Sequence, residues 1–413
     1  MGGRVIYVPI ASPIHDPDAV RAVNDSIKGS IKDLIHGEQG VTTTVSGVRE
    51  LGVEGVAAYV APVLTGGTEH LVLELARKGA PVAVVAHRGQ NSLAASLEAI
   101  SRIRYEGLPA HLLMFGDRGF RESLEVFLRA SRAYSGVRGS RVVLVGEPSP
   151  WLIYSNEQLG ALRKLLNLKF VRVGVDEVVN DAARVSEGEV GEALRRFRGA
   201  DMVGVGVEDV ARAVKVYVAL RRVLNRAGAR VLTIRCFDML DYGLTACLAL
   251  SMLNDEGFTA GCEGDVPSAV TMALLSGVSS RPSFMGNIAW VEGGEVLVAH
   301  CTVATKLVAN YRLRTHFESG LGVGVEGSLP KGSTVTMARL DALRGVIRAG
   351  VGEVVNEGPV TRDACRTQVL VRLKGGLKLV ENPMGNHYVI TPGDYRRELE
   401  VLAGLLNLGY EEV

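Results

Sequence analysis

Short apolar runs alternate with amphipathic stretches over the first two thirds of the chain, and this pattern predicts strands separated by helices. Near the N-terminus the candidate strands are Val5–Ile10, Val56–Val63, Pro81–Ala86 and His111–Phe115. The stretches with helical periodicity are Asp18–Ile35, Glu69–Lys78, Ser92–Tyr105 and Phe120–Tyr134. Strands that alternate with helices of this length form parallel βαβ units, and continuous apolar strands fit a sheet covered on both faces.

A second series of the same kind follows a polar, glycine-containing segment at residues 135–141. Its candidate strands are Val142–Gly146, Phe170–Val175, Met202–Val207 and Arg230–Phe237. Its candidate helices include Gln158–Leu166, Val190–Phe197, Val207–Ala227 and Leu244–Asn254. We therefore expect a second doubly wound parallel sheet.

The pattern changes after about residue 280, where long helices give way to short alternating segments separated by glycine. These segments are Ile288–Trp290, Glu295–His300, Lys306–Phe317, Thr334–Ala338, Gly352–Asn356 and Gln368–Val371. They favour a small β-barrel. A helix over Tyr395–Leu406, with Asp394 as its N-cap, ends the chain.

The predicted fold is thus α/β. It has two doubly wound, Rossmann-like parallel-sheet domains, at residues 1–138 and 139–280. A C-terminal antiparallel β-barrel domain with a terminal helix follows at residues 281–413.

Composition limits the class of protein. Of the 413 residues 47% are hydrophobic, and 46 basic residues balance 45 acidic ones. This excludes a disordered chain and argues against nucleic-acid binding, which needs a basic excess. No apolar segment reaches the about 18 residues of a membrane span, and the first residues form a strand-like run rather than a signal peptide. The five cysteines form no CxxC pair, so we expect a reduced, cytoplasmic protein.

Two weaker signals come from a glycine motif and from a histidine. The segment from Gly322 to Gly327 matches G-x-G-x-x-G, but a turn and a strand follow it rather than the helix that dinucleotide binding requires. His87 ends an apolar strand, and Asn91 and Ser92 come shortly after it. Because the carboxyl ends of parallel strands line the crevice of an open sheet, His87 and Asn91 are candidate substrate-binding residues. The alternative is capping of the next helix by Asn91 or Ser92.

Two acidic residues and two histidines are the strongest candidates for chemistry. Glu263 and Asp265 lie in the turn between a strand-like segment and an apolar helix that begins near Pro267. Asp265 is equally suited to be the N-cap of this helix. His300 ends an alternating strand, and His387 precedes the terminal helix. A carboxylate and two imidazoles are suitable ligands for a divalent metal such as Mn²⁺, but their spacing does not show whether they meet.

Several segments resemble the superfamily of L-fucose isomerase and L-arabinose isomerase, most closely its fucose-isomerase-related branch. The main ones are CFDMLDYGLTACLALSMLNDEGFTAGCEGDVPSAVTMALLSG, SFMGNIAWVEGGEVLVAHCTVATKL, HFESGLGVGVEG and NHYVITPGDYRRELEVLAGLLNL, and GEPSPWLIYS and QNSLAASLEAI extend the resemblance toward the N-terminus. The resemblance implies two α/β domains, a C-terminal barrel, and a homo-oligomer with active sites between subunits. It also implies a divalent metal, usually Mn²⁺, and aldose–ketose isomerisation of a sugar or polyol through an enediol.

The same resemblance assigns roles to single residues. Glu263 matches a metal ligand that also acts as a base, and His387 matches the histidine ligand near the C-terminus. His300 matches a further histidine of the arabinose-type site. One departure concerns a second acidic ligand, because here Gly286 and Asn287 stand where the family has it. Asn287 offers an amide oxygen to a substrate, but it cannot act as a base near neutral pH.

Other residues are candidates to complete the site. If the fold brings it close, Asp265 or Glu318 could replace the absent carboxylate as a catalytic group; otherwise the reaction differs. His316 and Glu318, two residues apart on a predicted strand, point to the same face and are candidate substrate-binding residues. Lys306 is a candidate partner for an anionic substrate group. For these residues the alternative is ordinary surface pairing or solvation.

Three functions therefore stay open at this point. The first is a metal-dependent sugar isomerase. The second is a different carbohydrate enzyme on the same scaffold, such as a lyase or epimerase, that needs only one carboxylate base. The third is a non-catalytic sugar-binding or regulatory protein that uses its two α/β domains as a clamp.

Overall fold

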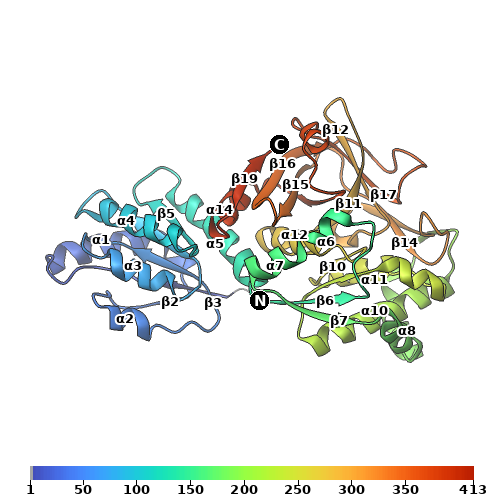
Figure 1. Ribbon diagram of the computed structural model, residues 1–413, viewed down its shortest axis with the longest axis horizontal. Coiled ribbons are helices and arrows are strands. Elements are labelled where there is room, and N and C mark those ends of the chain that lie inside the picture. Colours follow the sequence, from blue (N-terminus) through green and yellow to red (C-terminus); the bar gives the residue numbers. More distant parts are fainter. Residues whose placement is uncertain (1–2) are drawn as a thin grey trace. The chain divides into compact units, whose positions relative to one another are not determined.

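Residues 3–413 are described by a computed structural model, in which the chain divides into two compact units. Unit 1 comprises the residues up to Gly136 together with Arg397–Tyr410. Unit 2 comprises Val137–Arg396 and Glu411–Val413. Figure 1 labels the elements of both units. The second predicted α/β segment and the predicted barrel thus lie in the same unit.

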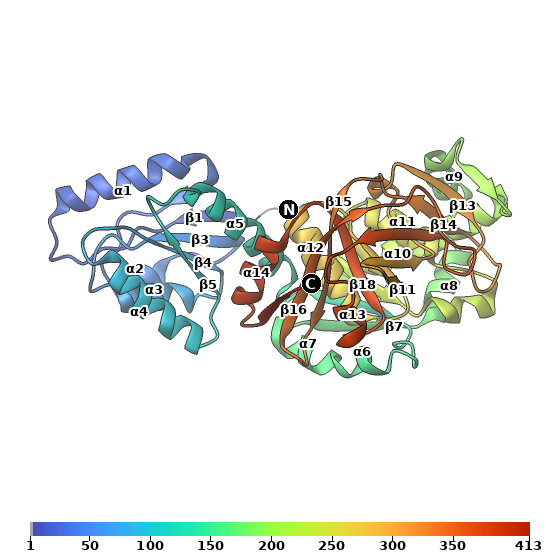
Figure 2. The same ribbon diagram turned by 90° about the horizontal axis from the view of Figure 1, so that it is seen from above.

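Unit 1 is built around a parallel sheet with the strand order β2-β1-β3-β4-β5. The strands are β1 (Arg4–Tyr7), β2 (Gly37–Glu38), β3 (Val56–Pro62), β4 (Val82–Ala86) and β5 (Ala110–Met114). The helices are α1 (Pro17–Ile31), η1 (Lys32–Leu34), α2 (Val45–Glu50), α3 (Glu69–Ala76), α4 (Ser92–Tyr105), α5 (Phe120–Val137) and α14 (Arg396–Leu405). Figure 2 shows α1 and α5 on one face of the sheet and α2, α3 and α4 on the other. This covering explains why β3 and β4 are apolar almost throughout.

Unit 2 contains a second parallel sheet, with the order β10-β9-β6-β7. Its strands are β6 (Arg141–Val145), β7 (Lys169–Val173), β9 (Val231–Ile234) and β10 (Thr259–Gly261). The helical segments are α6 (Ile153–Glu157), α7 (Leu159–Leu166), α8 (Val175–Ala183), α9 (Glu187–Leu194), η2 (Arg195–Phe197), α10 (Val207–Ala227), η3 (Cys236–Tyr242), α11 (Cys247–Asp255) and α12 (Val266–Ser279). The predicted parallel sheet is confirmed, but one of its expected strands lies elsewhere.

That strand is β8 (Asp201–Val203), which pairs with β13 (Asn310–Arg314) rather than with the parallel sheet. β13 also pairs with β14 (Gly324–Ser328) and so completes a small separate sheet. Two predictions were therefore wrong. The segment 202–207 does not belong to the second doubly wound sheet, and the segment 306–317 does not belong to the barrel. The physical reason is exposure: Asp201 and Val203 are exposed, and Leu313 is the buried side chain of β13.

The predicted antiparallel barrel is confirmed as a closed ring of strands. The ring runs β15-β18-β11-β12-β17-β16 and returns to β15. The strands are β11 (Phe284–Glu292), β12 (Glu295–His300), β15 (Thr334–Asp341), β16 (Val346–Val354), β17 (Thr367–Arg372) and β18 (His387–Pro392). β19 (Gly409–Glu412) extends β16 outside the ring, and the short helices η4 (Thr305–Leu307) and α13 (Lys378–Glu381) lie in connections.

Helix α12 connects the two layers of unit 2. Its side chains are buried on nearly every side, from Val266 to Leu275 and again at Val278. It contacts β9 and β10 of the parallel sheet as well as β15 and β18 of the barrel (Figures 1 and 2). A helix that is apolar all round belongs in a core, so α12 fixes the barrel against the sheet.

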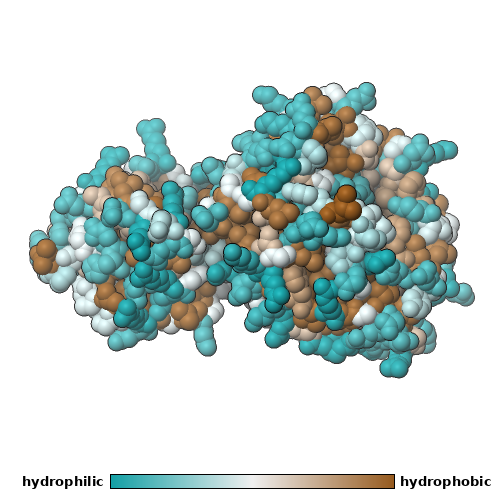
Figure 3. Space-filling model, in the orientation of Figure 1, coloured by the Kyte–Doolittle hydropathy of each residue, from teal (hydrophilic) through white to brown (hydrophobic). Residues whose placement is uncertain are grey.

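The surface agrees with the balanced composition. On the face shown in Figure 3, hydrophobic side chains are interspersed with hydrophilic ones. Within residues 3–413, no helix combines the length and the apolar character needed to cross a membrane. The predicted cap of the terminal helix is present, since the backbone N–H of Arg396 donates to Asp394 Oδ1 at 3.1 Å.

Candidate active site

The strand order of the sheet in unit 2 creates a crevice at its carboxyl edge. β6 and β9 are neighbours, but the chain leaves β6 toward β7 and leaves β9 toward β10. Loops that leave neighbouring strands in opposite directions open the crevice in which α/β proteins bind ligands. Trp151 follows β6 and Phe237 follows β9, and their rings meet edge to face with centroids 5.1 Å apart. These rings form an aromatic wall at the switch point.

Glu263 projects from the turn between β10 and α12. Its φ is +59°, in the left-handed region that costs a non-glycine residue about 1–2 kcal/mol. Gly264 continues the turn with φ +68° at a point where a Cβ would lie 2.8 Å from Pro148 Cα. Two backbone hydrogen bonds hold this conformation, from Ser149 N to Glu263 O at 3.1 Å and from Gly264 N to Ile234 O at 2.9 Å. The turn is therefore fixed against the loops that follow β6 and β9.

The barrel brings two histidines to this carboxylate. His300 ends β12 and His387 begins β18, and both strands are neighbours of β11. Oε1 of Glu263 lies 3.6 Å from His300 Nε2 and 3.4 Å from His387 Nε2. All three side chains are buried. The structure thus brings together the carboxylate and the two imidazoles that the sequence analysis selected as metal ligands.

The ring nitrogens of this cluster that lack a hydrogen-bond partner are suited to bind a divalent metal. Both ring nitrogens of His300 and Nε2 of His387 are buried without a hydrogen-bond partner. A buried polar group left in this state costs about 1–3 kcal/mol. One carboxylate oxygen and two imidazole nitrogens, all within 4.8 Å of one another, are a donor set that divalent transition metals accept. Glu263, His300 and His387 would hold such an ion.

Asp265 supports His387 instead of facing the cluster. Its Oδ2 is 2.9 Å from Nδ1 of His387, and its Oδ1 accepts the backbone N–H of Ser268 at 2.8 Å. The buried guanidinium of Arg339 lies 3.9 Å from the same carboxylate. The predicted N-cap role is confirmed, and Asp265 also orients the ring of His387. A carboxylate behind a ligating histidine is the usual outer shell of a metal site.

The charges in the cluster shift its titrations. Burial raises the pKa of Glu263, but His300 and His387 outweigh burial and hold that pKa well below its ordinary value. Burial also raises the pKa of Asp265, whereas His387 and Arg339 lower it to about 2. For His387 burial lowers the pKa, and Asp265 and Glu263 together raise it to about 9. The two carboxylates are therefore ionised at neutral pH.

Trp151 is a functional candidate that the sequence analysis did not single out. Its indole N–H donates to Oε2 of Glu263 at 2.9 Å, and its side chain is half exposed. The two carboxylate oxygens of Glu263 thus have different neighbours: Oε1 faces the histidines and Oε2 faces Trp151. A single aromatic residue in a loop has no motif. The signal that points to Trp151 is its position after a strand at the switch point, which requires the strand order.

Gly286 leaves no room for a side chain at the position where the resemblance places a second carboxylate. A Cβ at this position would lie 2.9 Å from Val298 Cγ1 and 3.0 Å from the backbone oxygen of Ala299. The neighbouring strand β12 thus occupies the space of a side chain. Asn287 lies opposite both His387 and Ala299 in the barrel register and accepts a 2.8 Å hydrogen bond from Asn386.

The remaining predicted residues have other contacts. His316 packs edge to face against Phe237, with centroids 5.8 Å apart, and its Nε2 lies 3.1 Å from Glu318 Oε2. Lys306 donates from Nζ to the backbone oxygen of Asp255, the last residue of α11, at 2.8 Å. This is a favourable position for a cation at a helix C-terminus.

His87 and Asn91 belong to unit 1. Nε2 of His87 contacts Leu64 O at 3.0 Å, and Gly89 N donates to Nδ1 at 3.1 Å. Asn91 precedes α4 in a left-handed conformation and makes no side-chain capping bond. The alternative, capping by Asn91 or Ser92, is wrong, because the hydroxyl of Ser92 bonds instead to His87 N at 3.0 Å and to Val63 O. Substrate binding by His87 or Asn91 stays a prediction.

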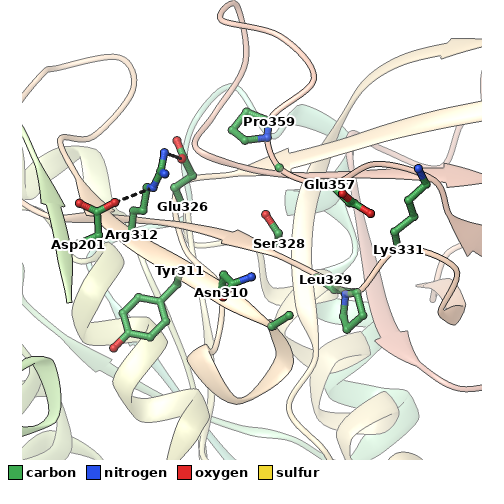
Figure 4. Close-up of a pocket in the computed structure, with 13 residues that line it drawn as sticks. Asp201, Asn310, Tyr311, Arg312, Glu326, Ser328, Leu329, Lys331, Glu357 and Pro359 are labelled. Atoms are coloured by element: carbon green, nitrogen blue, oxygen red, sulfur yellow. Dashed lines mark ion pairs between the residues drawn. The ribbon is translucent and has the colours of Figure 1, made fainter. Parts of the chain in front are cut away.

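A separate pocket lies beside the small sheet of unit 2. It encloses about 740 Å³ and is crossed by ion pairs from Arg312 to Asp201 and to Glu326 (Figure 4). Tyr311, Lys331 and Glu357 also line it. None of its lining residues is one of the predicted site residues.

The chain is similar in sequence to proteins that are named as sugar isomerases. No family model matches the chain. A sulfoquinovose isomerase of Clostridium sp. (strain MSTE9) is 23% identical over 78% of this chain and 76% of its own length. A sulfoquinovose isomerase of Alkalicoccus urumqiensis is 24% identical over 72% of this chain and 70% of its own. The L-arabinose isomerase of Thermotoga neapolitana is 24% identical over 48% and 42%. These relatives support a sugar isomerase family and do not single out the fucose-isomerase-related branch.

Proposed function

We propose that this protein is a metal-dependent aldose–ketose isomerase whose site is built from Glu263, His300 and His387. The observation that carries the proposal is the meeting of one ionised carboxylate with three unpartnered imidazole nitrogens at the switch point of a parallel sheet. The relatives named as sugar isomerases support the same reaction class. We further propose Mn²⁺ as the metal and a homo-oligomer with active sites between subunits.

The reaction moves a proton between C1 and C2 of a sugar. A divalent metal held by Glu263, His300 and His387 would supply Lewis acidity that lowers the free energy of the enediolate. Glu263 acts as the base: it takes the proton from C2 of an aldose and returns it to C1. Its Oε2 is suited to this task, because that oxygen faces the half-exposed Trp151 while Oε1 faces the histidines. Trp151 fixes the carboxylate, and its ring with that of Phe237 offers an apolar face to the sugar.

Asp265 has a positioning role in this scheme. It is fully buried and bonded to both His387 and the N-terminus of α12, so it has no free oxygen to offer a substrate as a base. The hydroxyl proton must therefore move from O2 to O1 without a second carboxylate at position 286.

This absence favours one alternative function. Because β12 fills the space at Gly286, the single-base site also suits an epimerase or a lyase that acts on a carbohydrate. Such an enzyme would need Glu263 but would not convert aldoses to ketoses.

The test is a turnover assay with purified protein, added Mn²⁺ and a panel of aldoses and ketoses that includes sulfoquinovose. Each product is identified, so that isomerisation, epimerisation and elimination are distinguished. We expect Glu263→Gln to lower kcat by about 10²–10⁴-fold, the usual contribution of a positioned base. Glu147→Gln is the matched control, because Glu147 pairs with Arg172 on the surface of the same crevice loops. If wild-type protein converts none of these sugars, the isomerase proposal is wrong.

A further inference from the structure

Two thiols and a carboxylate converge on the barrel side of the candidate active site. Cys301 directly follows β12, Cys365 precedes β17, and Glu318 lies in the loop between β13 and β14. One ligand atom from each of the three lies within 4.8 Å of the others. The measured contact between Cys365 Sγ and Glu318 Oε1 is 3.6 Å. We call this set the thiol cluster.

We propose that the thiol cluster is a second metal site, for a thiophilic divalent cation such as Zn²⁺. Thiolates are soft ligands that select Zn²⁺ over Mn²⁺ or Mg²⁺, whereas Glu263 with its two imidazoles accepts harder ions. Three protein ligands are also a common set around Zn²⁺, with water in the fourth position. The two sites of this chain therefore differ in the ions that they select.

The surroundings of the thiol cluster resemble the outer shell of a metal site. Oε2 of Glu318, the oxygen that does not face Cys365, lies 3.1 Å from Nε2 of His316. Nδ1 of His316 is in turn 3.0 Å from Ser319 Oγ. The backbone N–H of Phe317 donates to Cys301 Sγ at 3.4 Å. Hydrogen bonds of this kind orient ligands and stabilise the deprotonated thiol.

The charge of its ligands and its access to solvent also favour a cation at the thiol cluster. Once a divalent cation displaces the thiol protons, its charge would offset most of the repulsion between the two thiolates and the carboxylate. The adjacent Arg366 is already engaged, because its guanidinium donates to Thr315 O at 2.8 Å and to Thr315 Oγ1 at 3.1 Å. Cys301 is buried, but Cys365 is only partly buried and Glu318 is exposed. An ion can therefore enter from the solvent.

The proposal has a structural consequence for the first site. Cys301 is the residue after His300, and Val325 N donates to Cys301 O at 2.9 Å. An ion in the thiol cluster would tie the end of β12 to the loop before β17 and to the β13–β14 loop. It would thus fix the backbone that carries His300.

The test uses the full-length chain, reduced and stripped of metal, with Cd²⁺ and Zn²⁺ as probes. Cd²⁺ bound to thiolate has an ultraviolet charge-transfer band that a carboxylate–imidazole site does not produce. We expect this band in the wild type and in Glu263→Gln, and its loss in Cys365→Ser and in Cys301→Ser. Cys236→Ser is the matched control, since Cys236 contacts Cys262 at 3.0 Å outside the thiol cluster and should leave the band intact.

Zn²⁺ counted by elemental analysis after dialysis gives the second readout. We expect one Zn²⁺ ion more per wild-type chain than per Cys365→Ser chain. Circular dichroism of each variant checks that it folds, and Glu318→Gln provides a substitution that changes no thiol. A band that persists in Cys365→Ser would overturn the proposal. A disulfide between Cys301 and Cys365 in freshly purified protein, detected by mass, would overturn it as well.

Discussion

The carboxyl edges of the two parallel sheets are alike in topology and different in chemistry. In unit 1 both ring nitrogens of His87 at this edge contact the backbone, at Leu64 and Gly89. In unit 2 the edge meets a barrel, and His300 and His387 arrive with unpartnered nitrogens. Buried polar atoms are nearly always satisfied, so unsatisfied ring nitrogens that gather beside a buried carboxylate are explained best by a ligand. The crevice of the parallel sheet in unit 2 is a candidate site because the barrel supplies histidines whose ring nitrogens have no partner in the sheet.

The largest effect that tests this difference between the two edges is expected when a histidine at either edge is replaced by alanine. His387→Ala should weaken Mn²⁺ binding by more than about 100-fold, since even outer-shell changes cost 10–100-fold. His87→Ala is the control and should leave Mn²⁺ affinity unchanged, because its ring nitrogens serve the backbone of unit 1. Calorimetric titration measures both variants. Equal losses in the two would contradict the distinction between the edges.

A smaller effect is expected behind the ligand. Asp265→Asn keeps a good N-cap for α12 but removes the charge that orients His387. We expect Mn²⁺ affinity to fall by about 10–100-fold with little change in Tm. Asp265→Ala should lose the cap too, at a further cost of about 1 kcal/mol. Titration and thermal unfolding of the pair separate the two roles, and an unchanged affinity in Asp265→Asn would show that Asp265 only caps the helix.

The barrel next to the site sets a third test. Gly286→Ala forces a Cβ against β12 and should destabilise the protein by about 1–3 kcal/mol. Gly160→Ala is the control, because Gly160 lies in α7 with open space around its Cα and should gain about 0.5–1 kcal/mol. Chemical denaturation measures both. If Gly286→Ala is as stable as the wild type, packing does not explain the missing carboxylate.

The smallest expected effect concerns Trp151. Trp151→Phe keeps an aromatic ring and removes the N–H that holds Oε2 of Glu263. The loss of one such hydrogen bond is worth about 1 kcal/mol, or about fivefold in kcat/KM. The comparison with Phe237→Leu, which weakens the wall but leaves the N–H, shows which part of the wall acts on the carboxylate. A larger effect in Phe237→Leu would assign the wall to sugar binding alone.

Much of the fold follows from local pattern. Ser92–Tyr105 is helical over the predicted range, because its periodicity is long and uninterrupted. The brief strand β8 was assigned to the wrong sheet, since three half-exposed residues carry no signal of their partner. β18 was not predicted as a strand, although HYVITP alternates weakly and is buried in the barrel.

The candidate site was predictable in part. The sequence predicts three candidate metal ligands, Glu263, His300 and His387. Their proximity depends on barrel closure and on strand order, which the local sequence pattern does not contain. Asp265 could be read as a cap from its position before Pro267, whereas its bond to His387 joins positions 122 apart in sequence. His316 and Glu318 are in contact, but they lie in the loop after β13 and not on the predicted strand, and their neighbour Cys365 was not predicted because no motif links these residues.

The place of helix α12 gives the candidate metal site a consequence for stability. One ligand comes from the turn that precedes this helix, and the other two come from the barrel packed on its far side. An ion held by all three ligands would link the parallel sheet to the barrel. Because a ligand that binds only the folded state stabilises that state by mass action, the ion would raise the stability of unit 2. Chelation should therefore lower the melting temperature of unit 2 and leave that of unit 1 where it was.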